Sequence, residues 1–153
     1  MKSILTIVTH SNRLPVLEDV SLLLVRIGIG LAMLTHAIPK LVNYSTLSQT
    51  FFDPFGLGSQ VSLTMALSSE LVCSLLLILG LFTRFSAAML LFTMGIAVYM
   101  VGMAKGWAGN ELATVYCFVY VLLITFGGGK YSLERRIVPS ESEAVSPQSA
   151  KLA

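Results

Sequence analysis

The chain has 153 residues, of which 55% are hydrophobic and only 12% are charged, and its mean hydropathy is +0.80. A soluble domain carries about 25% charged residues, so this composition excludes an ordinary soluble domain. It indicates an integral membrane protein, whose expected partner is the lipid bilayer. The net charge of +2 gives no reason to expect a nucleic-acid partner.

Changes in composition divide the chain into three parts. Residues 1–19 hold a short apolar patch followed by polar residues, which is unlike a cleaved signal peptide and predicts a cytoplasmic tail. Residues 20–137 form the predicted membrane domain. Residues 138–153 are polar, contain prolines and lack helical periodicity, so we expect a disordered cytoplasmic tail.

The membrane domain contains four apolar runs, and a helix needs about 20 such residues to cross a bilayer. The fold class is therefore predicted as all-α, a four-helix transmembrane bundle. The predicted spans are residues 20–38, 61–82, 85–104 and 112–126.

Turn-forming and capping residues mark where these helices are expected to end. Pro39 is predicted to stop the first helix, because proline lacks a backbone donor and restricts the residue before it. The dipeptide Thr83-Arg84 should form a tight hairpin between the second and third helices. Asn110 is expected to cap the fourth helix and Gly127 to end it.

The loop before the second span, residues 43–60, has three phenylalanines close to Pro54. Non-helical backbone at membrane depth must be covered by protein, and aromatic residues favour the headgroup level. We therefore expect this loop to be an interfacial or re-entrant segment.

The distribution of basic residues predicts the orientation. The segments before the first span and after the fourth span, together with the loop between the second and third spans, hold seven lysines and arginines, whereas the other two loops hold only Lys40 and Lys105. Cytoplasmic loops carry the excess of basic residues, so both termini are predicted to be cytoplasmic. The protein is expected to be a multi-pass protein of the inner cell membrane.

Arg26 and Glu70 each stand alone in a long apolar run. A charge at the bilayer centre costs at least ~2.5–3.5 kcal/mol, and such residues usually face the bundle interior. We therefore predict that Arg26 and Glu70 form a buried ion pair between antiparallel helices. The pair would either fix the helix register or form a site in which Glu70 carries protons and Arg26 anchors a carbonyl or an anion.

Further polar residues are expected on the outer side, at the ends of the predicted spans. They are His36, Lys40, Tyr99, Trp107 and Glu111. With the buried pair they could line a polar path, and histidine and carboxylates suit proton exchange at its mouth. The alternative is that they are ordinary interface anchors. The candidate catalytic residues are Glu70, His36 and Glu111, and the candidate substrate-binding residues are Arg26, Tyr99 and Lys40.

The chain carries five motifs: Leu24–Gly30, His36–Leu41, Glu70 with Leu79–Arg84, Asn110-Glu111 and Gly127–Leu133. Together these motifs resemble the DoxX family of small membrane proteins, over roughly residues 20–137. The resemblance implies a four-helix membrane bundle and an association with redox chemistry: thiosulfate:quinone oxidoreduction, quinone or catechol stress, or membrane-bound oxidant defence. Family members often carry a histidine near the end of the third helix, where this chain has Tyr99 and Met103.

The sequence contains no haem, metal or nucleotide motif. Cys73 and Cys117 lie in apolar runs without metal-ligand spacing, and we interpret them as small core residues, with a redox pair as the alternative. The methionines are interpreted as core filling, and Tyr116 and Tyr120 as packing or lipid-belt residues. Redox chemistry would therefore need a bound quinone, a bound cofactor or a redox partner protein.

The leading hypothesis is a membrane subunit of an oxidoreductase system that acts on a quinone-type substrate near Arg26, Glu70 and His36. The alternatives are a proton-coupled transporter and a non-catalytic scaffold subunit. A single pocket with lipid access would favour the quinone, a continuous polar lining would favour transport, and a sealed core would favour the scaffold. Four helices of this size bury little surface, so a homo-oligomer is an alternative to a single-chain bundle.

Overall fold

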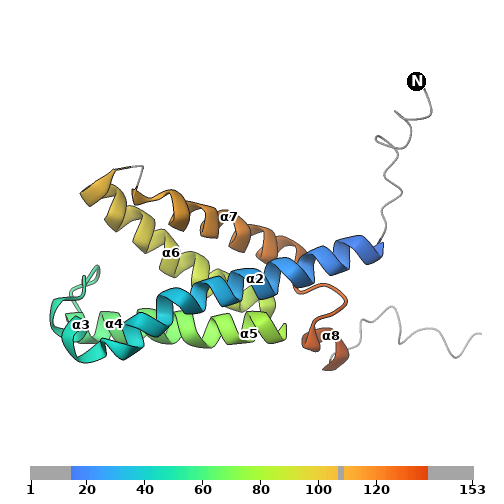
Figure 1. Cartoon of the computed structure of the whole chain (residues 1–153), viewed down its shortest axis with the longest axis horizontal. Helices are drawn as coiled ribbons and strands as arrows, with labels where there is room; N and C mark the ends of the chain where they lie inside the picture. Colours follow the sequence, from blue (N-terminus) through green and yellow to red (C-terminus); the bar gives the residue numbers. More distant parts are fainter. Residues whose placement is uncertain (1–14, 107–108, 138–153) are drawn as a thin grey trace, which may run out of the picture.

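The computed structural model describes residues 15–106 and 109–137, and within those residues it contains helices and no strand. The long helices lie side by side along the longest axis of the molecule (Figure 1). Residues 1–14 of the predicted N-terminal tail, Trp107 and the predicted tail from residue 138 lie outside the described residues, and residues 15–19 of the predicted N-terminal tail belong to a helix.

The first half of the bundle consists of α2 (Pro15–Val42), the short α3 (Tyr44–Thr50) and a second long rod. This rod is continuous from Ser59 to Leu79. It comprises α4 (Ser59–Ser68), the π-helical turn η1 (Ser69–Cys73) and α5 (Ser74–Leu79). The second half is the hairpin of α6 (Thr83–Lys105) and α7 (Glu111–Phe126), followed by the short α8 (Leu133–Ile137).

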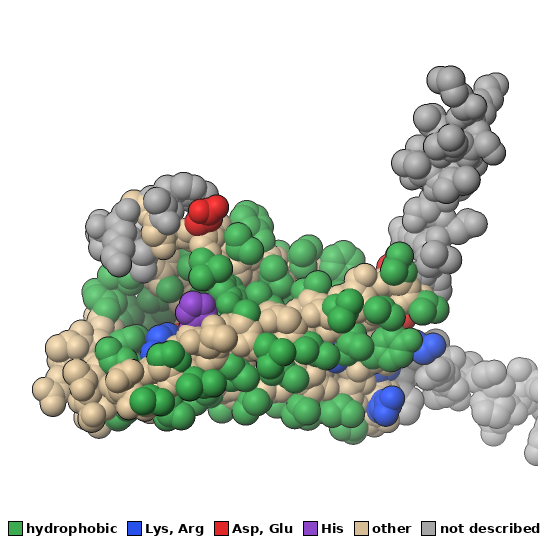
Figure 2. All heavy atoms as spheres, in the orientation of Figure 1, with side chains coloured by type: hydrophobic (Ala, Val, Ile, Leu, Met, Phe, Trp, Pro, Cys, Tyr) green, Lys and Arg blue, Asp and Glu red, His purple; other side chains and the backbone are tan. Residues whose placement is uncertain are grey.

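Three of these helices are long and apolar enough to cross a membrane, and α7 is a shorter apolar helix of 16 residues. Hydrophobic side chains cover most of the face seen in Figure 2, and lysines and arginines gather chiefly at the end where α2 begins. The predicted all-α architecture with membrane-spanning helices is thus confirmed. The helices exceed the predicted spans by a few residues at several ends.

The prediction that Pro39 stops the first helix is wrong. Pro39 lies inside α2, which continues to Val42, and the Pro39 carbonyl accepts hydrogen bonds from both the backbone N–H (3.0 Å) and the side-chain amide (2.9 Å) of Asn43. Proline removes one hydrogen bond from the helix, the one to the Thr35 carbonyl, and transmembrane helices tolerate such a loss. The consequence is that Lys40 belongs to the helix, one turn beyond His36.

The core forms where small residues let helices approach closely. Arg26, Gly30, Met33 and Ala37 share one buried face of α2, as their spacing predicts. A Cβ atom on Gly30 would lie 2.6 Å from Cγ1 of Ile78 and 3.1 Å from the Ser74 carbonyl oxygen, so α2 and α5 pack with almost no space between them.

The helix ends differ in part from the predictions. The turn between α5 and α6 consists of residues 80–82, and Thr83 and Arg84 already belong to α6. Asn110 does stand at the N-cap position of α7, but its side chain donates to the Val98 carbonyl (2.8 Å) on α6 instead of capping the helix. Gly127 ends α7 at φ +74°, as predicted.

Candidate functional site

The predicted ion pair between Arg26 and Glu70 is wrong. The buried carboxylate of Glu70 is paired with the ammonium group of Lys40 on α2. Arg26 lies beside Gly80, ten residues beyond Glu70, which is about 15 Å farther along the rod at ~1.5 Å per residue. The prediction failed because it placed Lys40 in a loop, whereas the continuing α2 brings Lys40 to the depth of Glu70.

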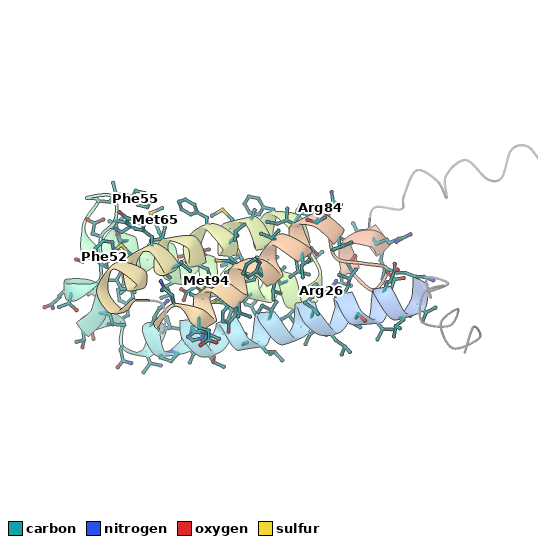
Figure 3. All side chains as sticks on the ribbon, turned by 90° about the horizontal axis from the view of Figure 1, so that it is seen from above. Arg26, Phe52, Phe55, Met65, Arg84 and Met94 are labelled. Carbon is teal, nitrogen blue, oxygen red and sulfur yellow. The ribbon has the colours of Figure 1, made fainter. Side chains whose placement is uncertain are left out.

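Arg26 holds the segment after α7 against the rest of the bundle. Its side chain is 1% exposed and donates hydrogen bonds to the carbonyls of Gly128 (2.6 Å) and Tyr131 (3.3 Å). Figure 3 shows Arg26 and Arg84 well away from the end that carries Phe52 and Phe55. The position of Arg26 is therefore that of a structural residue linking α2 to the chain between α7 and α8.

Glu70 lies in the π-helical turn η1, and its side chain is 1% exposed. One carboxylate oxygen, Oε1, accepts from Lys40, and the other, Oε2, is buried without a hydrogen-bond partner among the described residues. Single π turns inside α-helices occur frequently at functional sites. The Lys40 side chain is 27% exposed, so the pair lies at the boundary between the packed core and more open space.

That space is a cavity of about 220 Å³ between α2, α4, α6 and the loop before α4. Lys40 and Glu70 contribute the only charged side chains among the described residues that line it. The remaining lining residues are apolar or carry a hydroxyl: Phe51, Phe52, Pro54, Phe55, Ser62, Met65, Ala66, Ser69, Met89, Phe92, Thr93, Met94, Ile96, Ala97 and Met100. Figure 3 shows Phe52, Phe55 and Met65 together at one end of the molecule, with Met94 nearer its middle.

The sequence did not lead us to predict that methionines line a cavity. Met65, Met89, Met94 and Met100 line the cavity, and Met65 is more than half exposed, so core filling describes them incompletely. Met65 and Ser69 are four residues apart, as are Met89 and Thr93. That helical spacing beside Glu70 was the signal that could have indicated a shared lining face.

The loop of residues 51–58 folds over the cavity and is held by Asp53. Its carboxylate accepts hydrogen bonds from the Phe55 and Gly58 backbone N–H groups and from the Ser62 hydroxyl (2.8 Å). The Phe55 ring stacks on Phe92 of α6 with 6.3 Å between centroids and 7° between planes. The backbone N–H of Gly58 is the main cause that lowers the pKa of the Asp53 carboxyl from its ordinary value.

The other predicted site residues do not line the cavity. His36 is exposed and its ring meets Tyr116 edge-on at 5.8 Å. Tyr99 is 67% exposed on α6, and Glu111 is exposed at the first position of α7. The structure therefore brings together Lys40 and Glu70, and it leaves Arg26, His36, Tyr99 and Glu111 outside the cavity lining.

The remaining residues singled out in the sequence belong to the core. Tyr116 and Tyr120 are buried there, so the packing interpretation is right and the lipid-belt interpretation is wrong. Cys73 packs in the same cluster, Cys117 packs against it, and both thiols are free.

Membrane-length helices around an apolar cavity with a buried ion pair define a small helical integral membrane protein. The sequence model of the DoxX family matches residues 21–103, more than half of the chain, and the protein belongs to the DoxX family. An uncharacterized protein of Haemophilus influenzae is 30% identical over an alignment of 136 residues, and the match covers 82% of this chain and 90% of that relative. No solved structure matches.

Proposed function

We propose that the protein is a membrane subunit of an oxidoreductase system and that its cavity binds the ring of a quinone-type substrate. The observation that carries this proposal is the Lys40–Glu70 pair at the inner wall of an otherwise mostly apolar cavity. Lys40 takes the part that the sequence suggested for Arg26, that of orienting a ring oxygen, and Glu70 keeps the part of a proton carrier.

The size and the opening of the cavity suit such a ligand. Its volume of about 220 Å³ exceeds the roughly 150 Å³ of a protein cavity that accommodates benzene, so one substituted ring fits. Residues of its outer wall are exposed, with exposed fractions of 49% for Phe52, 54% for Met65 and 57% for Phe92. We expect the exposed sides of α4 and α6 to face lipid, so an apolar tail can extend from the ring into the bilayer.

Proton exchange with the aqueous phase would pass along α2. His36 precedes Lys40 by one helical turn and is exposed, so it can pass protons between the pair and the outer surface. Glu111 and Tyr99 are exposed on α7 and α6, where they can take part only at the outer mouth of such a path. Electrons would come from or go to a redox partner protein, and the N-in/C-in orientation in the inner membrane is part of this proposal.

The two alternatives fit the geometry less well. Transport would need a polar lining that continues through the bundle, whereas the described hydroxyls of the cavity wall are limited to three, those of Ser62, Ser69 and Thr93. A purely structural ion pair would need a sealed core, and the pair borders a cavity instead. The scaffold role does suit Arg26, whose hydrogen bonds go to backbone carbonyls.

The proposal is tested by titrating the quinol form of a short-chain benzoquinone, under anaerobic conditions, into the protein in nanodiscs. We expect Glu70→Gln and Lys40→Met each to weaken binding about tenfold or more, since a hydrogen bond to a charged group contributes ~1.5–3 kcal/mol. Glu18→Gln and Lys130→Met are matched controls, because both side chains are exposed and neither lines the cavity. They should bind like the parent protein.

Stability must be measured on the same samples. Removing one partner of a buried ion pair costs up to ~3–5 kcal/mol, and the partial exposure of Lys40 favours the lower end. Affinities are therefore compared per folded molecule, with the folded fraction taken from thermal unfolding. Equal affinity of both variants and the parent protein at matched folded fraction would exclude this cavity as the quinone site.

A further inference from the structure

We infer that the cavity binds the hydroxyl-bearing form of a ring ligand, a quinol or another phenol, in preference to the carbonyl form of the same ring. The inference rests on the proposed function in that both concern the same cavity. It adds the chemical class of the ligand and the redox form that binds more tightly. Both follow from which hydrogen-bond donors and acceptors of the cavity wall already have a partner within the protein.

The hydroxyl groups of the wall have no hydrogen left for a ligand. The Thr93 hydroxyl donates to the Met89 carbonyl (3.0 Å), so in its contact with the Ser69 hydroxyl (3.0 Å) Ser69 must be the donor. The Ser62 hydroxyl donates to the Asp53 carboxylate (2.8 Å). Each of these three hydroxyls can therefore only accept a hydrogen bond from a ligand.

In contrast, the cavity wall still has hydrogen-bond acceptors without a donor. Glu70 Oε2 has no partner among the described residues although the side chain is 1% exposed, and the residue lines the cavity. A buried charged oxygen without a donor carries its full desolvation cost, which a ligand O–H can relieve. The oxygen of Ser69 offers a second acceptor on the same helical rod.

Lys40 is the one remaining side-chain donor among the described residues of the wall. An ammonium group has three N–H donors, and one of them is used on Glu70 Oε1. A phenolic oxygen can accept from Lys40 while its hydrogen is donated to Glu70 Oε2. A ring carbonyl can accept from Lys40 but brings no hydrogen, so Glu70 Oε2 stays unpaired.

The test compares ligands of the same shape with and without the hydrogen. The probes are 4-tert-butylphenol and its methyl ether, and, under anaerobic conditions, the quinol and quinone forms of one short-chain benzoquinone. Titrations use the protein in nanodiscs, and empty nanodiscs correct for partition into lipid. We expect the O–H member of each pair to bind about tenfold more tightly, the usual effect of leaving one charged hydrogen-bonding group unpaired.

Two variants separate this preference from simple cavity occupancy. Glu70→Gln keeps the shape but supplies N–H donors, so we expect the two members of each pair to bind within about threefold of each other. Glu18→Gln, exposed on the same bundle, should keep the parent preference.

The outcomes distinguish the two proposals. Tight binding of both members with no preference in the parent protein would overturn this inference and leave the proposed cavity function standing. No binding of any probe would overturn both. A preference that persists unchanged in Glu70→Gln would also overturn the inference, because the hydrogen would then not be received by Glu70.

Discussion

The guanidinium group of Arg26 is enclosed by glycine backbone, and this explains two of the glycines in the chain. A Cβ atom on Gly80 would lie 2.5 Å from Nη1 and 2.6 Å from Cζ of Arg26, and one on Gly128 would lie 3.2 Å from Nη1. Gly80 also has φ +74°, a conformation that other residues adopt at a cost of ~1–2 kcal/mol. Arg26, Gly80 and Gly128 therefore act as one structural unit.

This unit predicts a difference between two glycine-to-alanine substitutions. Gly80→Ala should lower the free energy of unfolding by about 2–4 kcal/mol, through the backbone conformation and the clash with Arg26. Gly28→Ala is the matched control, because Gly28 lies in α2 and a Cβ atom added there would have no neighbouring atom within 4 Å. It should be neutral or stabilise by up to ~1 kcal/mol. Thermal unfolding in detergent measures both, and equal stability of the two variants would contradict the account.

At the scale of elements, the π-helical turn and the loop of residues 51–58 build the cavity between them. The turn η1 directs Glu70 inward from a rod that otherwise continues as α-helix. The loop lines the cavity through Phe51, Phe52 and Phe55. The two segments contribute different parts of the cavity wall: the rod contributes the charged Glu70, and the loop contributes apolar side chains.

The loop should respond to pH through Asp53. The pKa of the folded Asp53 carboxyl is lowered, chiefly by the Gly58 N–H, so its contribution to stability is present above the unfolded value of about 3.9 and is lost as the pH falls through the lower folded value. We expect the Gly58 amide to be protected from hydrogen exchange at pH 7 and to lose protection only below about pH 4.

The control for this prediction is Asp53→Asn. The amide cannot ionise, so the protection of Gly58 should be weaker at pH 7 and should not change with acidification once the intrinsic exchange rate is corrected. The contradicting result in the parent protein would be protection of the Gly58 amide that stays constant until the Asp53 carboxyl is fully protonated. That result would show that Asp53 does not hold the loop.

On the scale of the whole molecule, contacts far apart in the sequence join the start of α2, the α5–α6 turn and α8 at one end. The Lys130 N–H donates to Asp19 (2.8 Å), the Glu134 N–H donates to the Gly80 carbonyl (3.0 Å), and Glu134 accepts from the Thr83 N–H (3.2 Å). Arg84, Arg135 and Arg136 are exposed at this end. The cavity loop lies toward the other end (Figures 1 and 3).

The excess of basic residues predicts that the α8 end faces the cytoplasm. In a background with Cys73→Ala and Cys117→Ala, we expect Arg135→Cys to react with a membrane-impermeant maleimide only after cell lysis. Leu57→Cys, on the exposed cavity loop, should react in intact spheroplasts. The background without an added cysteine is the blank, and the reverse labelling pattern would invert the predicted topology.

The amino-acid sequence by itself determined the properties that depend on neighbours along the chain. The apolar runs predicted the helices, the isolation of Arg26 and Glu70 predicted their burial, and the spacing of Gly30, Met33 and Ala37 predicted the packed face of α2. Gly127 ends its helix as expected, because a left-handed position requires a residue without a Cβ atom.

Only the tertiary structure decided which groups meet. Lys40 became the partner of Glu70 because α2 continues through Pro39, and Arg26 found backbone carbonyls instead of a carboxylate because its depth differs from that of Glu70. The methionine wall and the loop over the cavity likewise depend on how three helices are aligned. Alignment between helices is a property of packing that no local pattern encodes, and a shift of a few residues changes every partner.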